Sequence, residues 1–232
     1  MNVVVTGASK GIGRAIAENF AADGANLFLC SRNMEATLKW QQELMQRFNI
    51  SITAFNADLS TAEGAKSFGE QLLKATDQVD VLVNNTGMYE PGSIYNEEEG
   101  QLERMLHVNL LSAYHLTRSL IQTMIKNKSG HIFNICSIAA LQAYPNGGSY
   151  SISKWALAGF SKNLREEMKP FNIKVTSVHP GATYTSSWEG SGVEEKRIME
   201  VNDVAKMIVA ASKLSPQACL EEMVLRPQLG DL

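Results

Sequence analysis

The chain reads Thr6-Gly7-Ala8-Ser9-Lys10-Gly11-Ile12-Gly13-Arg14 between an apolar, β-branched run at residues 2–6 and a segment of helical period at residues 11–23. In this spacing the first glycine makes a tight turn, the second lets backbone approach a pyrophosphate, and the third lets the helix pack closely on the strand. A strand exit followed by a helix is the context that such a motif requires. The stretch therefore predicts a dinucleotide-binding turn, with a bare structural turn as the alternative. Its cofactor-facing residues are expected to be Gly7, Ser9, Lys10, Gly11, Ile12 and Gly13.

Short apolar runs alternate with segments of helical period along the whole chain, which is typical of parallel strands joined by crossover helices. Strands are expected at residues 2–6, 26–31, 51–57, 80–84, 131–137, 173–179 and 219–225, and helices at residues 11–23, 34–48, 61–76, 98–127, 148–169 and 202–213. No stretch rich in Pro, Gly or Ser divides the chain. We therefore expect one α/β domain over residues 1–232, a doubly wound parallel sheet of about seven strands with helices on both faces.

The composition excludes several classes of protein. The 232 residues are 44% hydrophobic and 19% charged, as in ordinary globular proteins, and the net charge of -3 lacks the basic patch that nucleic acid or an anionic membrane would need. No apolar stretch approaches the roughly 20 residues that span a bilayer, and Met1 leads into the first strand without a signal-peptide pattern. A cytoplasmic protein without nucleic-acid or membrane partners is expected.

The cysteines and histidines indicate neither a disulfide framework nor a metal site. The three cysteines are odd in number and widely spaced, so buried reduced thiols are the preferred interpretation. The four histidines show no ligand spacing with one another or with the cysteines. No metal is expected.

The second strand ends in Leu29-Cys30-Ser31-Arg32-Asn33, where an acidic residue would favour a dinucleotide with a free ribose 2′-hydroxyl. This sequence has no acid there. Arg32 offers a planar fork for a 2′-phosphate, Lys10 adds a second cation and Ser31 adds a hydroxyl. The pattern favours NADP(H) over NAD(H), and a solvated surface charge at Arg32 is the alternative.

Polar residues also follow the third and fourth strands. Asp58, together with Leu59, is placed to accept a hydrogen bond from an adenine amino group, although Asp58 is equally placed to cap the following helix. Asn84-Asn85-Thr86-Gly87 ends the fourth strand at the edge where open α/β sheets bind ligands. Asn85 and Gly87 are expected to face the cofactor, and the alternative is that the two amides only tie strand ends together.

Tyr150 and Lys154 are four residues apart on a predicted helix, so they share one face. An ammonium beside a phenol lowers the phenol's pKa from its free value of about 10, which makes Tyr150 a usable proton donor. Ser137, at the end of the fifth strand, is placed to hold a substrate oxygen by a hydrogen bond. Asn109 is placed to hold a water that links Lys154 to solvent.

The order of these motifs resembles the short-chain dehydrogenase/reductase family over residues 1–228. The glycine turn, Asn-Asn-x-Gly, Asn, Ser, Tyr-x-x-x-Lys and Pro180-Gly181 follow one another at the family's spacing, with Thr86 where the family usually has alanine. The resemblance implies a Rossmann fold and carbonyl reduction with a tyrosine as general acid and a lysine that also contacts the nicotinamide ribose. The catalytic tetrad that it implies is Asn109, Ser137, Tyr150 and Lys154.

The segment Pro180-Gly181-Ala182-Thr183-Tyr184-Thr185 resembles the one by which the family holds the nicotinamide carboxamide, through backbone after the glycine and the hydroxyl of Thr185. A Pro-Gly turn that ends the sixth strand is the alternative. The cofactor contacts implied here are Pro180, Gly181, Thr183 and Thr185. Residues 183–200 are expected to form the substrate-binding loop, and a plain surface loop is the alternative.

The predicted helix over residues 98–127 is apolar on more than one stripe, which predicts a contact with another subunit. Deep packing within its own domain is the alternative. Together with the family resemblance, this surface leads us to expect a homodimer or a homotetramer.

The side chains near these motifs form an apolar and aromatic set: Met88, Tyr89, Leu141, Gln142, Tyr144, Tyr184 and Trp188. Aromatic faces suit a flat ring, and the scarcity of cations argues against a small anionic acid. Residues 130–133, 180–188 and 221–227 look like those of bacterial sepiapterin reductase-type members of the family, which reduce carbonyls on a pterin side chain with NADPH. The expected partner is therefore a small-molecule carbonyl substrate of this kind.

Other functions stay open at this point. Reduction of a 3-oxoacyl thioester on an acyl carrier protein would require a basic surface, for which Lys126, Lys128 and Lys169 are candidates. Cations near helix ends are, however, also favoured by the helix macrodipole. Oxidation of a sugar or an alcohol is a third option, and a sensor that binds the dinucleotide without turnover is a fourth.

Overall fold

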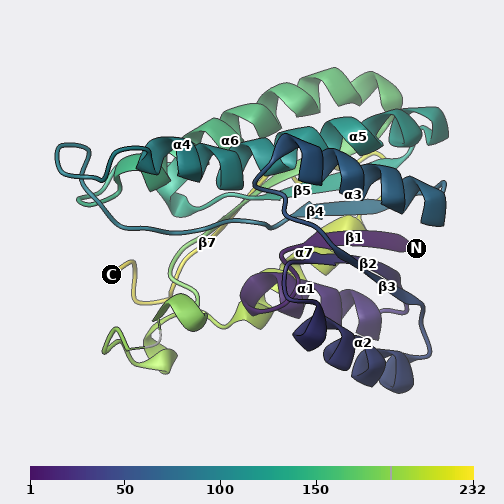
Figure 1. Cartoon of the computed structure of the whole chain (residues 1–232), viewed down its shortest axis with the longest axis horizontal. Coiled ribbons are helices and arrows are strands. Elements are labelled where there is room, and N and C mark those ends of the chain that lie inside the picture. The colour runs from purple at the N-terminus through teal and green to yellow at the C-terminus, as the bar shows by residue number, and fades with distance from the viewer. Residues whose placement is uncertain (189) are drawn as a thin grey trace.

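Seven parallel strands form one sheet in the computed structural model, which describes residues 1–188 and 190–232 (Figure 1). They are β1 (Asn2–Thr6), β2 (Asn26–Ser31), β3 (Ile52–Asn56), β4 (Val81–Asn84), β5 (Gly130–Ile135), β6 (Ile173–Pro180) and β7 (Glu222–Leu225). Their order is β3-β2-β1-β4-β5-β6-β7, and every neighbouring pair is parallel. The predicted doubly wound Rossmann sheet is confirmed. Position 189 of the predicted substrate loop 183–200 lies outside the described residues.

Helices cover both faces of this sheet. They are α1 (Gly11–Ala22), α2 (Met34–Phe48), α3 (Ala62–Ala75), α4 (Gln101–Leu106), α5 (Ser112–Asn127), α6 (Gly148–Met168) and α7 (Val201–Ser212). Figure 1 shows α1, α2 and α7 on one face and α3, α5 and α6 on the other. On the first face α1 packs against α7, and on the second α3 packs against α5.

Alternating side chains of β1 serve the two halves of the core. Val3 and Val5 belong to one buried cluster together with Phe20 of α1, whereas Val4 belongs to the other cluster together with Phe68 of α3. All five side chains are 0% exposed. Because successive residues of a strand point to opposite faces, one apolar run fills both layers, and each fully buried side chain contributes about 1.5–3 kcal/mol.

The helix predicted over residues 98–127 is two helices, α4 and α5, joined by a π-helical turn at His107–Leu111. In this turn the backbone N–H of Ser112 donates to the carbonyl of His107, five residues earlier. Much of the apolar surface that predicted a subunit contact is buried inside the chain. Its fully buried members are Met105, Leu116, Leu120 and Met124. Packing within the domain therefore accounts for them, and the oligomer stays a prediction.

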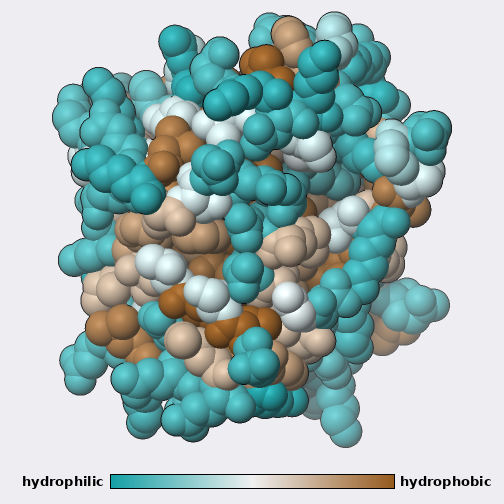
Figure 2. All heavy atoms as spheres, turned by 90° about the vertical axis from the view of Figure 1, so that its right-hand side faces the viewer, coloured by the Kyte–Doolittle hydropathy of each residue, from teal (hydrophilic) through white to brown (hydrophobic). Residues whose placement is uncertain are grey.

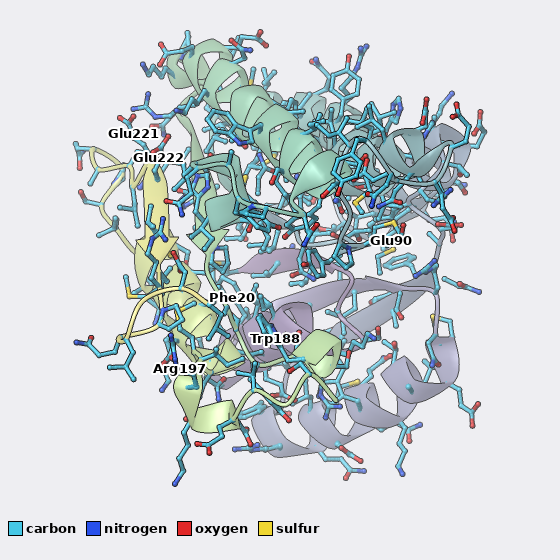
Figure 3. The ribbon with its side chains drawn as sticks, turned by 90° about the vertical axis from the view of Figure 1, so that its left-hand side faces the viewer. Phe20, Glu90, Trp188, Arg197, Glu221 and Glu222 are labelled. Carbon is cyan, nitrogen blue, oxygen red and sulfur yellow. The ribbon has the colours of Figure 1, made fainter. Side chains whose placement is uncertain are left out.

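The strand order reverses at the β1–β4 pair, and ligands of open α/β sheets bind outside the carboxyl ends of the strands at such a point. Figure 2 shows the opposite side of the molecule, where β1 begins. Hydrophobic side chains gather in the middle of this face, and hydrophilic side chains surround them. No helix in the described part of the chain is long and apolar enough to cross a membrane. Figure 3 views the carboxyl edge, where the predicted site residues meet.

Candidate active site

The glycine turn is shaped by backbone conformation and by lack of space. Gly7 and Gly11 have φ of +61° and +58°, a left-handed conformation that favours glycine. A Cβ atom at Gly13 would lie 2.3 Å from Asn85 Nδ2 and 2.5 Å from the carbonyl oxygen of Gly7. Gly7 therefore fits the predicted tight turn, and Gly13 fits the predicted close packing of helix on strand.

Asn85 ties the end of β4 to this turn. Its side-chain Nδ2 donates to the carbonyl oxygens of Thr6, at 2.9 Å, and of Gly7, at 3.2 Å. Its backbone N–H donates to the hydroxyl of Thr6 at 2.9 Å. Asn84 similarly donates to Asn134 Oδ1 of β5 at 2.8 Å. In this structure the two amides therefore join strand ends, as the alternative interpretation expected. Asn85 lies directly behind the glycine turn.

The N-terminus of α1 opens toward the carboxyl edge of the sheet. The first turn of α1 holds no acidic residue, and its N-cap residue, Lys10, makes no side-chain capping hydrogen bond within the described chain. A helix N-terminus left in this state presents backbone N–H groups and a partial positive charge to an anion. The charge and the free N–H groups of this turn are therefore compatible with an anion.

At the end of β2, Arg32 is exposed and Ser31 is buried, with its hydroxyl accepting from the backbone N–H of Asn33 at 3.0 Å. Asp58 accepts from the backbone N–H of Ser60 at 3.0 Å. Its pKa is lowered, first by its hydrogen bonds to Ser60 and more weakly by the positive charge of Arg32. Arg32 and Asp58 therefore lie near enough to interact at the adenosine end of the predicted site.

The alternative that Asp58 caps α3 is wrong. The N-cap residue is Thr61, whose hydroxyl accepts from the backbone N–H of Gly64 at 3.0 Å. Threonine at this place has the standard capping geometry, which leaves Asp58 to stabilise the preceding turn. Leu59 is 4% exposed and packs in the core, so only its backbone remains to face a cofactor.

Tyr150 and Ser137 meet at the start of α6. The hydroxyl of Ser137 accepts from the backbone N–H of Ala139 at 3.1 Å and lies near the phenol of Tyr150. Burial raises the pKa of Tyr150, and the nearby hydroxyl of Ser137 partly offsets this effect. The phenol is therefore kept protonated, which suits a proton donor.

Lys154 is 5% exposed, and its Nζ donates to the carbonyl of Ile135 at 2.9 Å. Burial lowers its pKa to about 8. Nζ lies 5.8 Å from the centroid of the Tyr150 ring. The expectation that the ammonium lowers the pKa of Tyr150 is wrong for this structure, because burial of the phenol dominates and Lys154 is not among the described groups that shift it.

Asn109 lies in the π-helical turn and is fully buried. Its Oδ1 accepts from the backbone N–H of Met88 at 2.8 Å, and its Nδ2 donates to the Met88 carbonyl at 3.1 Å and to the hydroxyl of Ser153 at 2.8 Å. A Cβ atom at Gly87 would lie 3.3 Å from Asn109 Oδ1 and 3.4 Å from Lys154 Nζ. Asn109 therefore holds the segment after β4, beside Lys154, and the predicted water link stays a prediction.

Three tyrosines gather at the mouth of the site. The ring of Tyr89 packs edge-on against that of Tyr150, with centroids 4.9 Å apart. Tyr144 lies near Tyr89 and Tyr150, and burial raises its pKa. Of the other predicted pocket residues, Met88 is half-buried, while Gln142 is exposed and accepts from Arg226 Nη2 at 3.4 Å.

The segment after β6 reaches from the sheet to the glycine turn. The Gly181 N–H donates to the Leu225 carbonyl at 2.8 Å, and the Thr183 hydroxyl donates to the Gly181 carbonyl at 3.0 Å. The methyl group of Thr185 lies 3.4 Å from the Cβ position of Gly11. The predicted carboxamide segment and the predicted pyrophosphate turn are therefore in contact.

Tyr184 and Trp188 continue this segment toward the substrate side. Tyr184 is half-buried, and its backbone N–H donates to the carbonyl of Met199 at 2.8 Å. Trp188 lies in the middle of the carboxyl edge, between α6 and the N-terminal helices (Figure 3). The structure thus places an aromatic side chain at the carboxyl edge of the sheet.

One residue that the sequence did not single out lies directly behind this site. His179 is fully buried, and its Nδ1 lies 3.0 Å from the carbonyl oxygen of Ser137, so that it is placed as a donor. Burial lowers its pKa, which keeps the ring neutral. The only sequence signal was its place directly before Pro180-Gly181. Among the described residues, no group of three or more His, Cys, Asp or Glu side chains is placed to hold a metal ion.

Comparisons with known proteins agree with this geometry. The family model described as short chain dehydrogenase matches residues 1–196. A sepiapterin reductase of Chlorobaculum tepidum is 31% identical over 99% of this chain and 97% of its own length. An alcohol dehydrogenase of Thermococcus sibiricus, solved with 5-hydroxy-NADP, superposes with a TM-score of 0.90 at 27% identity, covering 98% of this chain and 96% of its own. L-sorbose reductase of Gluconobacter frateurii, solved with NADPH and L-sorbose, gives 0.90 at 26% identity, covering 97% and 94%.

Proposed function

The chain belongs to the short-chain dehydrogenase family and is an oxidoreductase, and from this premise we propose that it reduces a ketone to an alcohol with NADPH. The observation that carries the proposal is the placement of the Ser137 hydroxyl near the phenol of Tyr150, with Lys154 Nζ 5.8 Å from the centroid of the same ring. We propose Asn109, Ser137, Tyr150 and Lys154 as the catalytic residues.

The residues of the glycine turn fit a dinucleotide, because a phosphate would be received by the uncapped N-terminus of α1 beside Gly11. When bound, the nicotinamide supplies the hydride. Thr183, Thr185 and the backbone after Gly181 are proposed to hold its carboxamide, since this segment already contacts the turn. Lys154 is proposed to contact the nicotinamide ribose.

In the proposed mechanism the substrate oxygen lies between the hydroxyls of Ser137 and Tyr150. Ser137 donates a hydrogen bond that orients the carbonyl, and Tyr150 transfers its proton to the oxygen as negative charge develops there. The raised pKa of Tyr150 keeps its proton in place until that moment. Lys154, with a pKa of about 8, is able to exchange a proton with its surroundings at ordinary pH and so to help restore the phenol.

We propose that NADP(H) is preferred over NAD(H). Support comes from exposed Arg32 after β2 and exposed Lys10 in the glycine turn, with no acidic side chain at the end of β2. The solved relatives with 5-hydroxy-NADP and with NADPH point in the same direction. A 2′-phosphate would receive the planar fork of Arg32.

We propose a pterin with a side-chain ketone as the substrate. Support comes from Tyr89, whose ring packs against that of Tyr150, and from Trp188, which lies at the carboxyl edge of the sheet (Figure 3), because aromatic side chains suit a flat heteroaromatic ring. The sepiapterin reductase relative matches nearly the whole chain, including the proposed substrate loop 183–200. By contrast, Lys169 of the basic set considered for a carrier protein forms an ion pair with Glu166.

The proposal is tested by the initial rate of NADPH oxidation with sepiapterin, compared with an acetoacetyl thioester. Turnover of the pterin alone supports the proposed substrate, and a Trp188→Ala variant is then expected to raise the KM for the pterin but not that for NADPH. Turnover of the thioester alone would contradict the pterin. Tight NADPH binding without turnover of either would favour the sensor function.

The proposed homodimer or homotetramer is supported by exposed apolar side chains on α6 and at the sheet edge. Ile152 and Trp155 of α6 are 40% and 52% exposed, and Val224 of the edge strand β7 is 50% exposed. Light scattering after gel filtration tests this proposal, and a monomer at micromolar concentration would contradict it.

A further inference from the structure

The helix that carries Tyr150 and Lys154 begins without a cap of its own. α6 starts at Gly148 after Gly147, and neither residue has a side chain that could accept from the first backbone N–H groups. Gly148 has a φ of +29°, so the chain enters the helix in a conformation that favours glycine. The free N–H groups at a helix start need partners from elsewhere.

Glu97 supplies those partners from a distant part of the chain. Its Oε1 accepts from the backbone N–H of Ser149 at 2.7 Å, and its Oε2 accepts from the hydroxyl of Ser149. Ser149 is 1% exposed and directly precedes Tyr150. A carboxylate at a helix N-terminus is also favoured by the helix macrodipole. The first turn of α6 is therefore held by one side chain that lies 52 residues earlier.

Two glycines make room for this carboxylate. A Cβ atom at Gly148 would lie 1.9 Å from Glu97 Oε1, and one at Gly92 would lie 2.7 Å from Glu97 Cγ. The backbone N–H of Gly92 donates to the Asn146 carbonyl at 3.1 Å, and the Ser93 hydroxyl donates to Asn146 Oδ1 at 2.8 Å. These hydrogen bonds hold the segment after β4 against the residues that lead into α6, and the Glu97 carboxylate lies between them.

The same segment also reaches the reacting end of the site. Tyr89, eight residues before Glu97, packs its ring edge-on against Tyr150. Arg104 of α4 forms ion pairs with two carboxylates of this segment: its Nη2 lies 3.5 Å from Glu90 Oε2 and 3.7 Å from Glu98 Oε2. The segment after β4 therefore contacts the ring of Tyr150 through Tyr89 and holds the backbone of Ser149 through Glu97.

We propose that Glu97 is a positioning residue that holds Tyr150 in line with Ser137 by fixing Ser149 at the start of α6. This inference rests on the proposed carbonyl reduction. Glu97 acts through two hydrogen bonds to Ser149, so an isosteric amide retains the function, because it accepts from the N–H and donates to the hydroxyl oxygen. A small displacement of a reacting group lowers the rate steeply.

The experiment compares five variants with the wild type: Glu97→Ala, Glu97→Gln, Ser149→Ala, the double variant of Glu97→Ala with Ser149→Ala and, as control, Glu98→Ala. Glu98 is the next residue and its side chain is 86% exposed, so its removal is expected to change nothing. For Glu97→Ala we expect kcat per NADPH-binding site to fall about tenfold, while the Kd for NADPH stays within twofold. Glu97→Gln is expected to restore most of kcat. Ser149→Ala keeps the backbone N–H, so its kcat is expected to lie between that of the wild type and that of Glu97→Ala. The double variant is expected to have the same kcat as Glu97→Ala.

Hydrogen exchange at residues 149–152 provides a second readout that needs no substrate. Glu97→Ala is expected to speed exchange there, and Glu98→Ala is not. An unchanged kcat, unchanged exchange, or a Glu97→Gln variant as impaired as Glu97→Ala overturns the inference. If the wild type reduces no carbonyl compound, the proposed function fails, and the exchange result then decides whether Glu97 fixes the helix. Should Glu97→Ala fail to fold, Ser149→Ala and Glu97→Gln carry the comparison.

Discussion

The ring of Tyr89 stands edge-on to the ring of Tyr150, at 4.9 Å between centroids and 85° between planes. Tyr150 comes from α6, whereas Tyr89 comes from the segment after β4, so this contact joins the two walls of the site. Tyr89 is still 50% exposed, which leaves part of its ring open to a ligand. If Tyr150 acts as proposed, the exposed part of the Tyr89 ring lies beside the proposed substrate carbonyl.

Replacement of Tyr89 by alanine should therefore weaken substrate binding. The variant loses an aromatic contact worth about 0.5–1.5 kcal/mol, and we expect the KM for the carbonyl substrate to rise about threefold to tenfold. The KM for NADPH should stay unchanged. Tyr95→Ala, on the same segment and 89% exposed, is the control. Equal effects of the two changes in steady-state kinetics would show that Tyr89 does not contact the substrate.

Replacement of Tyr150 by phenylalanine removes the proton donor and leaves the ring in place. Carbonyl reduction should fall by about 10²–10⁴-fold, because the ring still fills its site while no phenol proton is available. NADPH affinity, followed by fluorescence titration, should be nearly unchanged. Retention of wild-type turnover would exclude Tyr150 as the general acid.

Replacement of Arg32 by aspartate should change the cofactor preference. The change removes the guanidinium fork and places a negative charge where a 2′-phosphate would lie, so the ratio of kcat/KM for NADH to that for NADPH should rise at least about tenfold. Arg47→Asp, at the far end of α2, makes the same change of charge and serves as control. If Arg32→Asp keeps the wild-type preference, the phosphate is read by other residues.

Replacement of Gly13 by alanine should damage the turn. The new Cβ would meet Asn85 Nδ2 at 2.3 Å and the Gly7 carbonyl at 2.5 Å. We expect the free energy of unfolding to fall by about 1–3 kcal/mol and NADPH binding to weaken. Gly159→Ala is the control, because nothing lies within 4 Å of its Cβ position on α6. Denaturant unfolding of both variants checks this, and equal stability of the two would refute the steric account.

The pH dependence of stability should reveal the buried Lys154. Its pKa is about 8 in the folded protein, below its ordinary value of 10.5. Between these values the unfolded chain binds more protons than the folded one, so the free energy of unfolding of the cofactor-free protein gains from this group as pH rises from about 8 to about 10.5. Wild type should therefore become more stable relative to Lys154→Met over this window. A constant difference across it would mean that Lys154 titrates normally.

The order of elements was predictable because parallel α/β sheets repeat one pattern of apolar periods. The strand at residues 26–31 and the helix at residues 34–48 were predicted with the bounds that the structure has. The last strand was predicted too long, since only Glu222–Leu225 pairs with β6. Cys219 and Leu220 are apolar like the strand that follows, but pairing depends on a neighbour that the local sequence does not describe.

The site was predictable where its residues follow a strand end or share a helix face. Tyr150, Lys154 and Asn85 are of this kind. The contact of Glu97 with Ser149 was not, because it joins residues 52 apart through a loop without period. Equally, the pKa of Tyr150 depends on how much water its surroundings exclude, which follows from packing and not from the neighbouring Lys154 alone.

The π-helical turn at His107–Leu111 fixes the angular register of two helical segments that face different partners. One residue more or less rotates everything beyond it by about 100° around the helix axis. Deletion of a single residue from this turn would rotate α4, which buries Met105, relative to α5, which buries Leu116 and Leu120. Asn109 would also leave the backbone of Met88. The length of this turn is thus constrained twice, by the side chains that α4 and α5 bury and by the hydrogen bonds of Asn109 to Met88, so we expect an insertion or a deletion here to cost more stability than a single substitution.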